Sequence, residues 1–422
     1  MKADVVIVGA GTAGAAVALQ CARRGLRAIV LERRKLERAG AHWHNGVPGW
    51  SFDAAGIARP VHPELVAANH PFHLVAGWGP TRVVVTDHDV LEVDMARLVA
   101  RLQGDARAAG AVLVDDVRVS GCDGGHLDTS AGPFDARWIV DASGLGGVGL
   151  LPTEPVARED ICTATQRVYA VSDVPAAEAW FRERGVTPGD TLCHASVAGG
   201  FSIINVRLHG DELAILTGTI PSGDIPSGRA LLEDFVAALP WLGEKRSGGS
   251  SPIPLRRPYD VLASDRVALI GDAACQVFAA HGSGISAQLV ASRVLAEALA
   301  DGSGPLGYQR RWQRQWGGLF AAYDLFRRFS ETLDADDLAR LMRAGVMCPD
   351  TVADGMAQRW PRLGPARLAG VARGAARDPR AVVQLVPVIA RMGLARALFA
   401  VYPRDLEHLP RWQRAVARML GP

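Results

Sequence analysis

The feature that most constrains the fold is a glycine-rich turn near the start of the chain. Residues 3–8 are an apolar run that predicts a buried parallel strand, and Gly9-Ala10-Gly11-Thr12-Ala13-Gly14 follows it directly. The spacing of residues 13–24 predicts a helix, and residues 27–31 predict a second strand. This order is that of a βαβ unit, the first part of a Rossmann-type sheet.

Each glycine of the turn has its own role in binding a nucleotide pyrophosphate. Gly9 allows the tight turn, Gly11 lets the backbone approach the phosphates, and Gly14 lets the helix pack on the strand. The first helical residues, Thr12 and Ala13, present N–H groups and the positive end of the helix dipole to the phosphates. A glycine turn without a nucleotide has the same local pattern, so the residues that follow decide the interpretation.

Glu32 ends the predicted second strand, where nucleotide-binding βαβ units place a carboxylate. A carboxylate there accepts hydrogen bonds from ribose hydroxyls and repels a 2′-phosphate. Arg33 follows it and is expected in the same site. The unit therefore predicts a dinucleotide with a free adenosine ribose.

A second motif lies far along the chain. Residues 266–270 predict a strand, and Gly271-Asp272 follows it as a turn. Gly282-Ser283-Gly284-Ile285 then opens a helix predicted over 285–300. Asp272 is placed to accept hydrogen bonds from a polyol, and Gly282 and Gly284 let the backbone approach a flat ring. The helix N-terminus favours the negative charge that a reduced flavin develops. A strand–turn–helix occurs in any α/β protein, so the second motif alone is weak evidence. Both motifs in one chain predict FAD.

These motifs, with Val140-Asp141-Ala142-Ser143-Gly144 between them, resemble a flavoprotein superfamily. It includes para-hydroxybenzoate hydroxylase, geranylgeranyl reductases, flavin-dependent halogenases and lycopene cyclases. The resemblance implies that Asp272 contacts the ribityl or pyrophosphate region and that residues 282–285 lie at the isoalloxazine. On a helix predicted over 94–109, Arg97 lies where members of the superfamily often carry cofactor-contacting residues; the alternative is a solvated surface arginine. The likeness covers residues 1–150 and 262–300.

Departures from the superfamily patterns bear on the reaction. We find no Asp-Gly motif of the aromatic hydroxylases near 168–172 and no Trp-x-Trp-x-Ile-Pro signature of the halogenases. The reductases carry Pro-Leu-Thr-Gly-Glu-Gly before the last helix, where this chain has Ala279-Ala280-His281-Gly282-Ser283-Gly284. The overall layout is nearest to that of the reductases.

The pattern between the two motifs predicts an insertion. Short alternating runs such as 201–208 and 212–218 predict antiparallel strands, and strands around 117–121 and 132–140 are expected to pair. We expect an α/β fold: a Rossmann-type FAD-binding domain, an inserted antiparallel β-sheet substrate domain and a helical C-terminal region. The expected limits are 1–60, 95–150 and 262–304 for the FAD-binding domain, 61–94 and 151–261 for the substrate domain, and 305–422 for the helical region.

Three histidines are candidates for moving a proton. His281 directly precedes the glycine pair expected at the flavin, so it can donate or shuttle a proton if it reaches the ring. The alternative for His281 is a loop histidine exposed to water. His42 and His44 lie between Ala41 and Trp50, in a segment expected to pass towards the flavin. The alternative is a packed loop whose histidines satisfy backbone groups. No third ligand accompanies His42 and His44, so we expect no metal site.

Charge and composition bear on whether the protein binds nucleic acid or a membrane. The net charge of +2 gives no reason to expect a nucleic-acid partner. The last residues, 356–422, hold twelve arginines against three acidic residues, interleaved with apolar side chains. Such a tail can lie on an anionic membrane, cover a long apolar substrate, or form a helical cap with a solvated basic face. Pro387, Arg391 and Arg396 interrupt the longest apolar run, so we expect no transmembrane segment.

We therefore expect a cytoplasmic, bacterial, FAD-dependent oxidoreductase that acts on an organic biosynthetic substrate by hydride transfer at flavin N5. One alternative is a monooxygenase that uses a flavin hydroperoxide, and another is a redox-neutral or non-enzymatic FAD-binding protein. The chain contains no second nucleotide fingerprint. A separate electron donor or reductase is therefore an expected partner, besides the small-molecule substrate.

Overall fold

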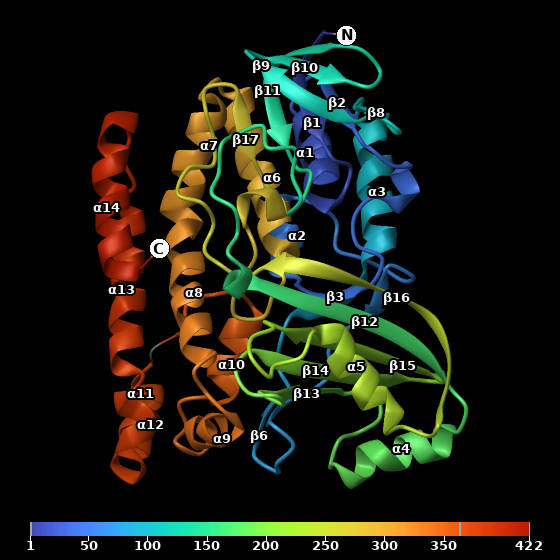
Figure 1. The fold of residues 1–422 in the computed structure, drawn as a ribbon, viewed down its shortest axis with the longest axis vertical. Coiled ribbons are helices and arrows are strands. Elements are labelled where there is room, and N and C mark those ends of the chain that lie inside the picture. The colour runs from blue at the N-terminus through green and yellow to red at the C-terminus, as the bar shows by residue number, and fades with distance from the viewer. Residues whose placement is uncertain (1, 363, 422) are drawn as a thin grey trace.

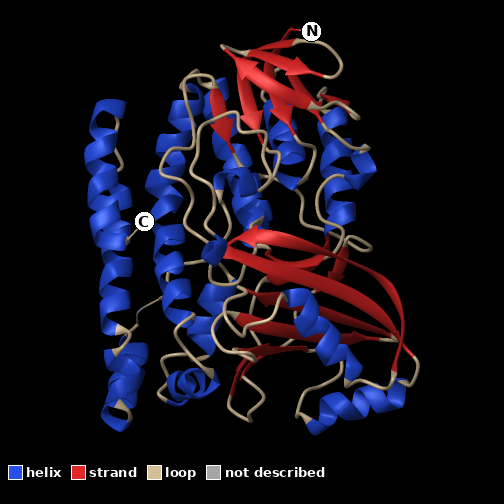
Figure 2. Ribbon diagram, in the orientation of Figure 1, coloured by secondary structure: helices blue, strands red, loops and turns tan. Residues whose placement is uncertain are grey.

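The computed structural model describes residues 2–362 and 364–421, whose strands form three sheets (Figures 1 and 2). The first sheet has the order β8-β2-β1-β11-β10-β9, and β17 pairs with β11. Its strands are β1 (Lys2–Val8), β2 (Ala28–Leu31), β8 (Val112–Val114), β9 (Val119–Asp123), β10 (His126–Thr129), β11 (Phe134–Asp141) and β17 (Val267–Leu269). The predicted βαβ unit therefore forms part of this sheet.

Parallel pairing joins β8, β2, β1, β11 and β17, as a Rossmann-type sheet requires. Three helices cover one face: α1 (Thr12–Ala22), α3 (Met95–Ala108) and α6 (Ile285–Ala300). Helix α1 contacts both α3 and α6, and its residues are almost all buried because small side chains allow this close packing. The Rossmann-type fold predicted from the sequence is confirmed.

The predicted pairing of strands around 117–121 and 132–140 is wrong. Strand β10 lies between β9 and β11 and pairs antiparallel with both. Gly124 and Gly125 have φ angles of 54° and 102°, which residues other than glycine rarely adopt. They turn the chain back directly after β9, so an additional short strand forms before β11 begins.

The second sheet is antiparallel except where β13 runs parallel to β5, and it has the order β16-β12-β15-β14-β13-β5-β6. Its strands are β5 (Phe72–Ala76), β6 (Arg82–Val85), β12 (Ile161–Val171), β13 (Thr191–Ala195), β14 (Ser202–His209), β15 (Glu212–Thr219) and β16 (Leu242–Pro254). Helices α4 (Val174–Glu183) and α5 (Gly228–Ala237) cover one face, and their buried Phe181 and Leu232 share a core cluster with Ile204 and Ile215. The opposite face is left for the cavity described below.

A third, three-stranded sheet joins β3 (His44–Pro48), β7 (Val90–Asp94) and β4 (Leu65–Ala67). Short helix α2 (Trp50–Ala55) follows β3, and β7 leads directly into α3. Residues 61–94 thus contribute strands both to this small sheet and, through β5 and β6, to the second sheet. The domain limits expected from the sequence remain a prediction.

Beyond α6 the chain is mainly helical, as Figure 1 shows along one side of the molecule. They are α7 (Gly304–Trp312), α8 (Gly318–Ser330), α9 (Ala335–Arg343), α10 (Pro349–Met356), α11 (Pro365–Arg377), α12 (Pro379–Val383), α13 (Val386–Ala400) and α14 (Leu409–Leu420). A π-helical turn over Gln313–Gly317 joins α7 to α8. Arg327 of α8 is almost fully buried and donates to Asp160, which directly precedes β12, at 2.6 Å. This ion pair ties the helical region to the second sheet.

Helix α1 approaches the end of β1 so closely that Gly14 has no room for a side chain. A Cβ atom on Gly14 would lie 1.8 Å from the carbonyl oxygen of Gly9. We expect Gly14→Ala to lower the melting temperature by several degrees, since forcing atoms into a packed interior costs about 1–3 kcal/mol. Thermal unfolding followed by circular dichroism measures this effect.

Gly104 in α3 provides the matched control. A Cβ atom there would meet nothing within 4 Å, so Gly104→Ala should leave the melting temperature unchanged or raise it slightly. Equal melting temperatures for Gly14→Ala and Gly104→Ala would contradict the close approach.

Candidate functional site

The turn between β1 and α1 is held by contacts between backbones. A Cβ atom on Gly9, whose φ is 102°, would lie 2.5 Å from the carbonyl oxygen of Ala142, in the segment after β11. The N-cap of α1 is Gly11, which has no side chain to bond the free N–H groups of the first turn. Those groups, including the N–H groups of Thr12 and Ala13, are therefore positioned for an anionic ligand such as a pyrophosphate.

Glu32 lies beside this turn and is 5% exposed. Its carboxylate accepts a hydrogen bond from the Ala10 N–H at 2.9 Å and another from the Arg34 N–H at 3.1 Å. Each carboxylate oxygen keeps a further lone pair for a ribose hydroxyl. Gln103 of α3 supports the same turn, since its amide donates to the Ala10 carbonyl at 2.9 Å.

The second motif meets the first in space. Gly271 follows β17, and a Cβ atom on it would lie 3.0 Å from Cβ of Ala13. Asp272 lies in the same short turn, where burial raises the pKa of its carboxyl to about 6, and Gln288 of α6 donates to it at 3.1 Å. A partly buried carboxylate to which, among the described side chains, Gln288 donates is suited to accept further hydrogen bonds from the hydroxyls of a polyol.

The start of α6 is the second free helix N-terminus of the site. Its N-cap is Gly284, which provides no side-chain cap, and the first turn contains no acidic residue. Ser283 Oγ lies 3.5 Å from the carbonyl oxygen of Gly46 in β3. Residues 282–285 therefore lie next to the segment that contains His44.

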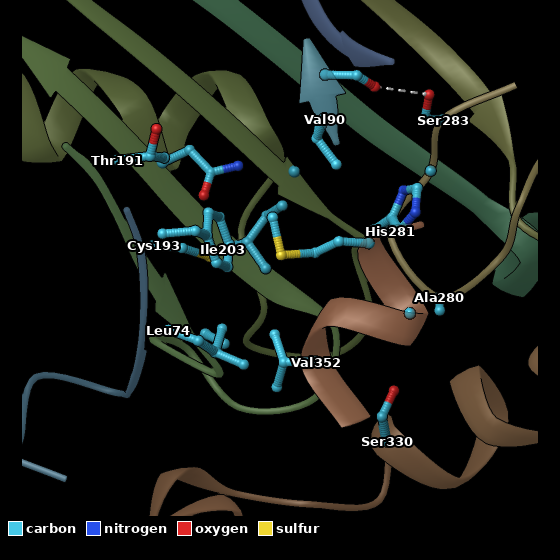
Figure 3. Close-up of a pocket in the computed structure, with 18 of the residues that line it drawn as sticks. Leu74, Val90, Thr191, Cys193, Ile203, Ala280, His281, Ser283, Ser330 and Val352 are labelled. Carbon is cyan, nitrogen blue, oxygen red and sulfur yellow. Dashed lines mark hydrogen bonds between the residues drawn. The ribbon is translucent and has the colours of Figure 1, made fainter. Parts of the chain in front are cut away.

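A cavity of about 740 Å³ begins at these residues. It runs along the uncovered face of the second sheet, beneath α8, α9 and α10, to α11 and α13. Figure 3 shows Leu74, Cys193 and Ile203 of the sheet opposite Val352 of α10, with His281 and Ser283 at the flavin side. Most lining side chains are apolar, so the cavity suits a long apolar molecule.

His281 lines the cavity, and its environment keeps the ring neutral. Burial lowers the pKa of His281 to about 4, and its Nε2 atom is buried without a hydrogen-bond partner among the described residues. The ring packs against Phe278, with the ring centroids 5.0 Å apart. A neutral imidazole is a poor proton donor at neutral pH.

His44 also lines the cavity and has the opposite electrostatic environment. Its Nδ1 lies 3.5 Å from Glu92 Oε1, and this carboxylate raises the pKa of His44. Glu92 in turn pairs with Arg207 of β14, which is buried, and His44 and Arg207 hold the pKa of Glu92 down against the effect of burial. The backbone N–H of His44 donates to Gln166 of β12 at 2.7 Å, so the position of β3 against the second sheet is fixed.

The other predicted residues lie outside the cavity. His42 is exposed and is not among the described residues that line it. Arg33 is exposed, and Arg97 is exposed and pairs with Asp94 at 3.2 Å. Among the described residues, no group of three or more histidine, cysteine or acidic side chains could hold a metal ion.

Comparisons with known proteins agree with this geometry. Residues 4–65 match the family model described as FAD dependent oxidoreductase. Digeranylgeranylglycerophospholipid reductase 2 of Methanopyrus kandleri is 27% identical over 81% of this chain and 93% of its own length. Menaquinone reductase of Mycolicibacterium smegmatis is 27% identical over 74% of this chain and 79% of its own.

Two solved structures show the same fold. A geranylgeranyl bacteriochlorophyll reductase-like protein from Thermoplasma acidophilum has a TM-score of 0.71, with 16% identity over 92% of this chain and 99% of that chain. The halogenase PltM in complex with phloroglucinol and FAD has a TM-score of 0.61, with 14% identity over 99% of this chain and 95% of that chain. The chain is an FAD-dependent oxidoreductase.

The residues of this FAD-dependent oxidoreductase fit its cofactor. The two helix N-termini at Gly11 and Gly284 have no side-chain caps, so they would suit the negative charge of a pyrophosphate and of a reduced flavin. The buried carboxylate of Glu32 and the partly buried carboxylate of Asp272 keep acceptor capacity for ribose and ribityl hydroxyls. We therefore expect Glu32 to hold the adenosine half and Asp272 the flavin half.

Sequence reasoning missed the polar residues that support the site. Gln103, Gln166 and Gln288 come from three separate elements, and each bonds a segment of the site. Glu92 and Arg207 were missed as well. Gln288 carried a weak signal, because it lies one turn after Gly284 on the predicted helix. The others become neighbours of the site only through the packing of the sheets.

The raised pKa of Asp272 predicts opposite effects of Asp272→Asn on stability and on cofactor binding. Burial favours the protonated acid in the folded apoprotein, so the wild type pays a penalty that grows above pH 4 and is complete above about pH 6. We expect Asp272→Asn to stabilise the apoprotein at pH 8 by about 1–3 kcal/mol, with no gain below about pH 4.

The same change should weaken FAD binding, because a charged acceptor of hydrogen bonds is worth about 1.5–3 kcal/mol. Calorimetric unfolding of the apoprotein at several pH values and FAD titration measure the two effects. FAD affinity equal to that of the wild type would show that Asp272 does not contact the cofactor.

Proposed function

We propose that the protein reduces a carbon–carbon double bond in a long apolar biosynthetic substrate. The observation that carries this proposal is the long apolar cavity that begins beside residues 282–285 and has His44 in its wall. Because apolar side chains outnumber polar ones in its wall, a cavity of this size suits an apolar chain better than a small hydrophilic substrate. The reductases named above, whose names refer to a lipid and a quinone, support the same reading.

FAD supplies, when bound, a hydride donor at N5. Reduction of the double bond requires a hydride on one carbon and a proton on the other, so the protein must provide the proton. The electrons come from a reduced donor, for which we propose a separate reductase or a transiently bound nicotinamide. The chain's own residues hold the apolar substrate against the sheet and deliver the proton.

His44 is the better placed of the two cavity histidines to donate the proton. Its raised pKa keeps a protonated fraction near neutral pH, whereas His281 is neutral there. Glu92 orients the ring through Nδ1, which leaves Nε2 for the cavity side. Arg207 positions Glu92 and prevents that carboxylate from taking up the proton itself. His281 then serves as part of the cavity wall.

The state of the cysteines bears on the cell compartment. All six cysteines are free, and Cys21, Cys162, Cys193 and Cys275 are buried. Free thiols in this number are typical of a reducing compartment. On this ground we propose that the enzyme works in the cytoplasm.

The experiment that tests the function uses the purified, photoreduced holoenzyme mixed anaerobically with geranylgeraniol as the apolar alkene. We expect flavin reoxidation and a product that gains two hydrogens, identified by mass spectrometry. Failure of the alkene to reoxidise the flavin, together with a product that gains one oxygen atom when air is admitted, would support a monooxygenase instead.

Removing the imidazole of His44 should slow this reaction. We expect His44→Ala to reduce the rate of flavin reoxidation by the alkene about a hundredfold, the usual contribution of a general acid. The wild-type rate should also fall as the pH rises through the raised pKa of His44, because the neutral ring has no proton to give. Stopped-flow absorbance measures both effects.

His42→Ala is the matched control, since it removes an exposed histidine two residues away and should keep the wild-type rate. A normal rate for His44→Ala combined with a large loss for His281→Ala would transfer the donor role to His281.

A further inference from the structure

Helix α13 presents an apolar stripe to the outside of the molecule. Its exposed face is apolar or small except for Arg391 and Arg396 and contains no acidic residue. Its largest exposed side chains are Val386 at 57%, Ile389 at 56% and Leu394 at 44%. Val383 at the end of α12 and Val401 directly after α13 are also exposed, at 65% and 68%. Isolated exposed apolar residues are common, but a row along one helix face indicates a binding surface.

The inner face of α13 is firmly packed, so the stripe cannot simply turn inward. Ala395 and Phe399 are buried against α8. A Cβ atom on Gly317 would lie 2.3 Å from Phe399, and one on Gly318 would lie 3.1 Å from Cα of Arg396. These glycines let the two helices approach closely and fix which side of α13 faces outward.

The stripe lies where the cavity reaches the surface. Leu385, Met392 and Gly393 line the cavity together with Ile389, which is also more than half exposed. The same side chain thus belongs to the cavity wall and to the outer stripe. Ile389 therefore brings the outer stripe next to the cavity wall.

Positive charge surrounds the stripe. Residues 356–422 carry twelve arginines against three acidic residues, which leaves the rest of the chain net negative because the whole chain is only +2. Arg391 and Arg396 flank the stripe on α13, and exposed Arg411, Arg414 and Arg418 lie on the neighbouring α14. A basic, apolar face on an acidic body complements an anionic lipid surface, and it opposes a symmetric contact between two positive faces.

We propose that α13 is the membrane-docking surface of the enzyme and that it seats the cavity mouth on an anionic phospholipid bilayer. Among the described residues, none of the helices combines the length and apolar character that crossing a membrane requires, so the contact is peripheral. The apolar stripe enters the headgroup boundary while the arginines bind lipid phosphates. The apolar substrate then moves sideways from the bilayer into the cavity without crossing water; this step rests on the proposed function.

The test uses the FAD-loaded enzyme and flotation with vesicles of phosphatidylcholine alone or mixed with phosphatidylglycerol. We expect the protein to float with the anionic vesicles, and raising the salt to 0.5 M, where the Debye length is only a few ångströms, should release most of it. The double variant Val386→Asp/Leu394→Asp should bind these vesicles at least tenfold more weakly. Neither side chain lines the cavity, so turnover of a short, water-dispersed alkene should stay at the wild-type rate.

Val61→Asp/Val112→Asp adds the same two carboxylates at exposed valines elsewhere and should float like the wild type. Equal vesicle binding by the stripe variant and the wild type would overturn the proposal. So would wild-type protein that ignores vesicles but forms a dimer which the stripe variant breaks in light scattering, because α13 would then bind a second copy. Vesicle binding needs no turnover, so a failure of the alkene reaction would leave this result standing.

Discussion

The close approach of three backbones at the start of the chain is the constraint on which the rest of the structure depends. Gly14 lies against Gly9, and Gly9 lies against Ala142, with no space for a Cβ atom at either glycine. This contact aims the N-terminus of α1 along the end of β1 and brings β11 beside it. Since β17 then pairs with β11, the same contact also determines where Asp272 and the start of α6 can lie.

A partly buried charge network links the small sheet to the second sheet beside the cavity. His44 lies in β3, Glu92 in β7 and Arg207 in β14, so the network spans the small sheet and the second sheet. Removing one member would leave a buried charge without its partner, which makes such networks expensive to break. The network therefore sets the position of the cavity wall relative to the flavin side, and it couples that position to the protonation of His44.

Much of the fold could be predicted from local sequence patterns, because the interactions that form these elements are local. The turn at Gly9–Gly14, the helix over 285–300 and the strands at 202–209 and 212–219 follow from glycine spacing, helix starts and alternation, and they were predicted from the sequence. The strand at 126–129 was missed because a pair of glycines made room for it. Glu92 and Arg207 were missed because they are far apart in sequence and meet only after the sheets have packed. His44 and His281 were recognised as candidates, but only burial and the Glu92 contact distinguish them.

The flavin site is assembled from segments that leave the ribosome at very different times. The turn at Gly9–Gly14 is among the first residues made, whereas Gly271, Asp272 and Gly284 follow the whole of the second sheet. Until then β11 lacks the neighbour β17, and the face of α1 that α6 covers is exposed. A nascent chain that ends before residue 285 therefore has a nucleotide turn but no complete cofactor pocket. Cofactor insertion is consequently a late step of biosynthesis, and the unfinished sheet needs protection from aggregation in the meantime.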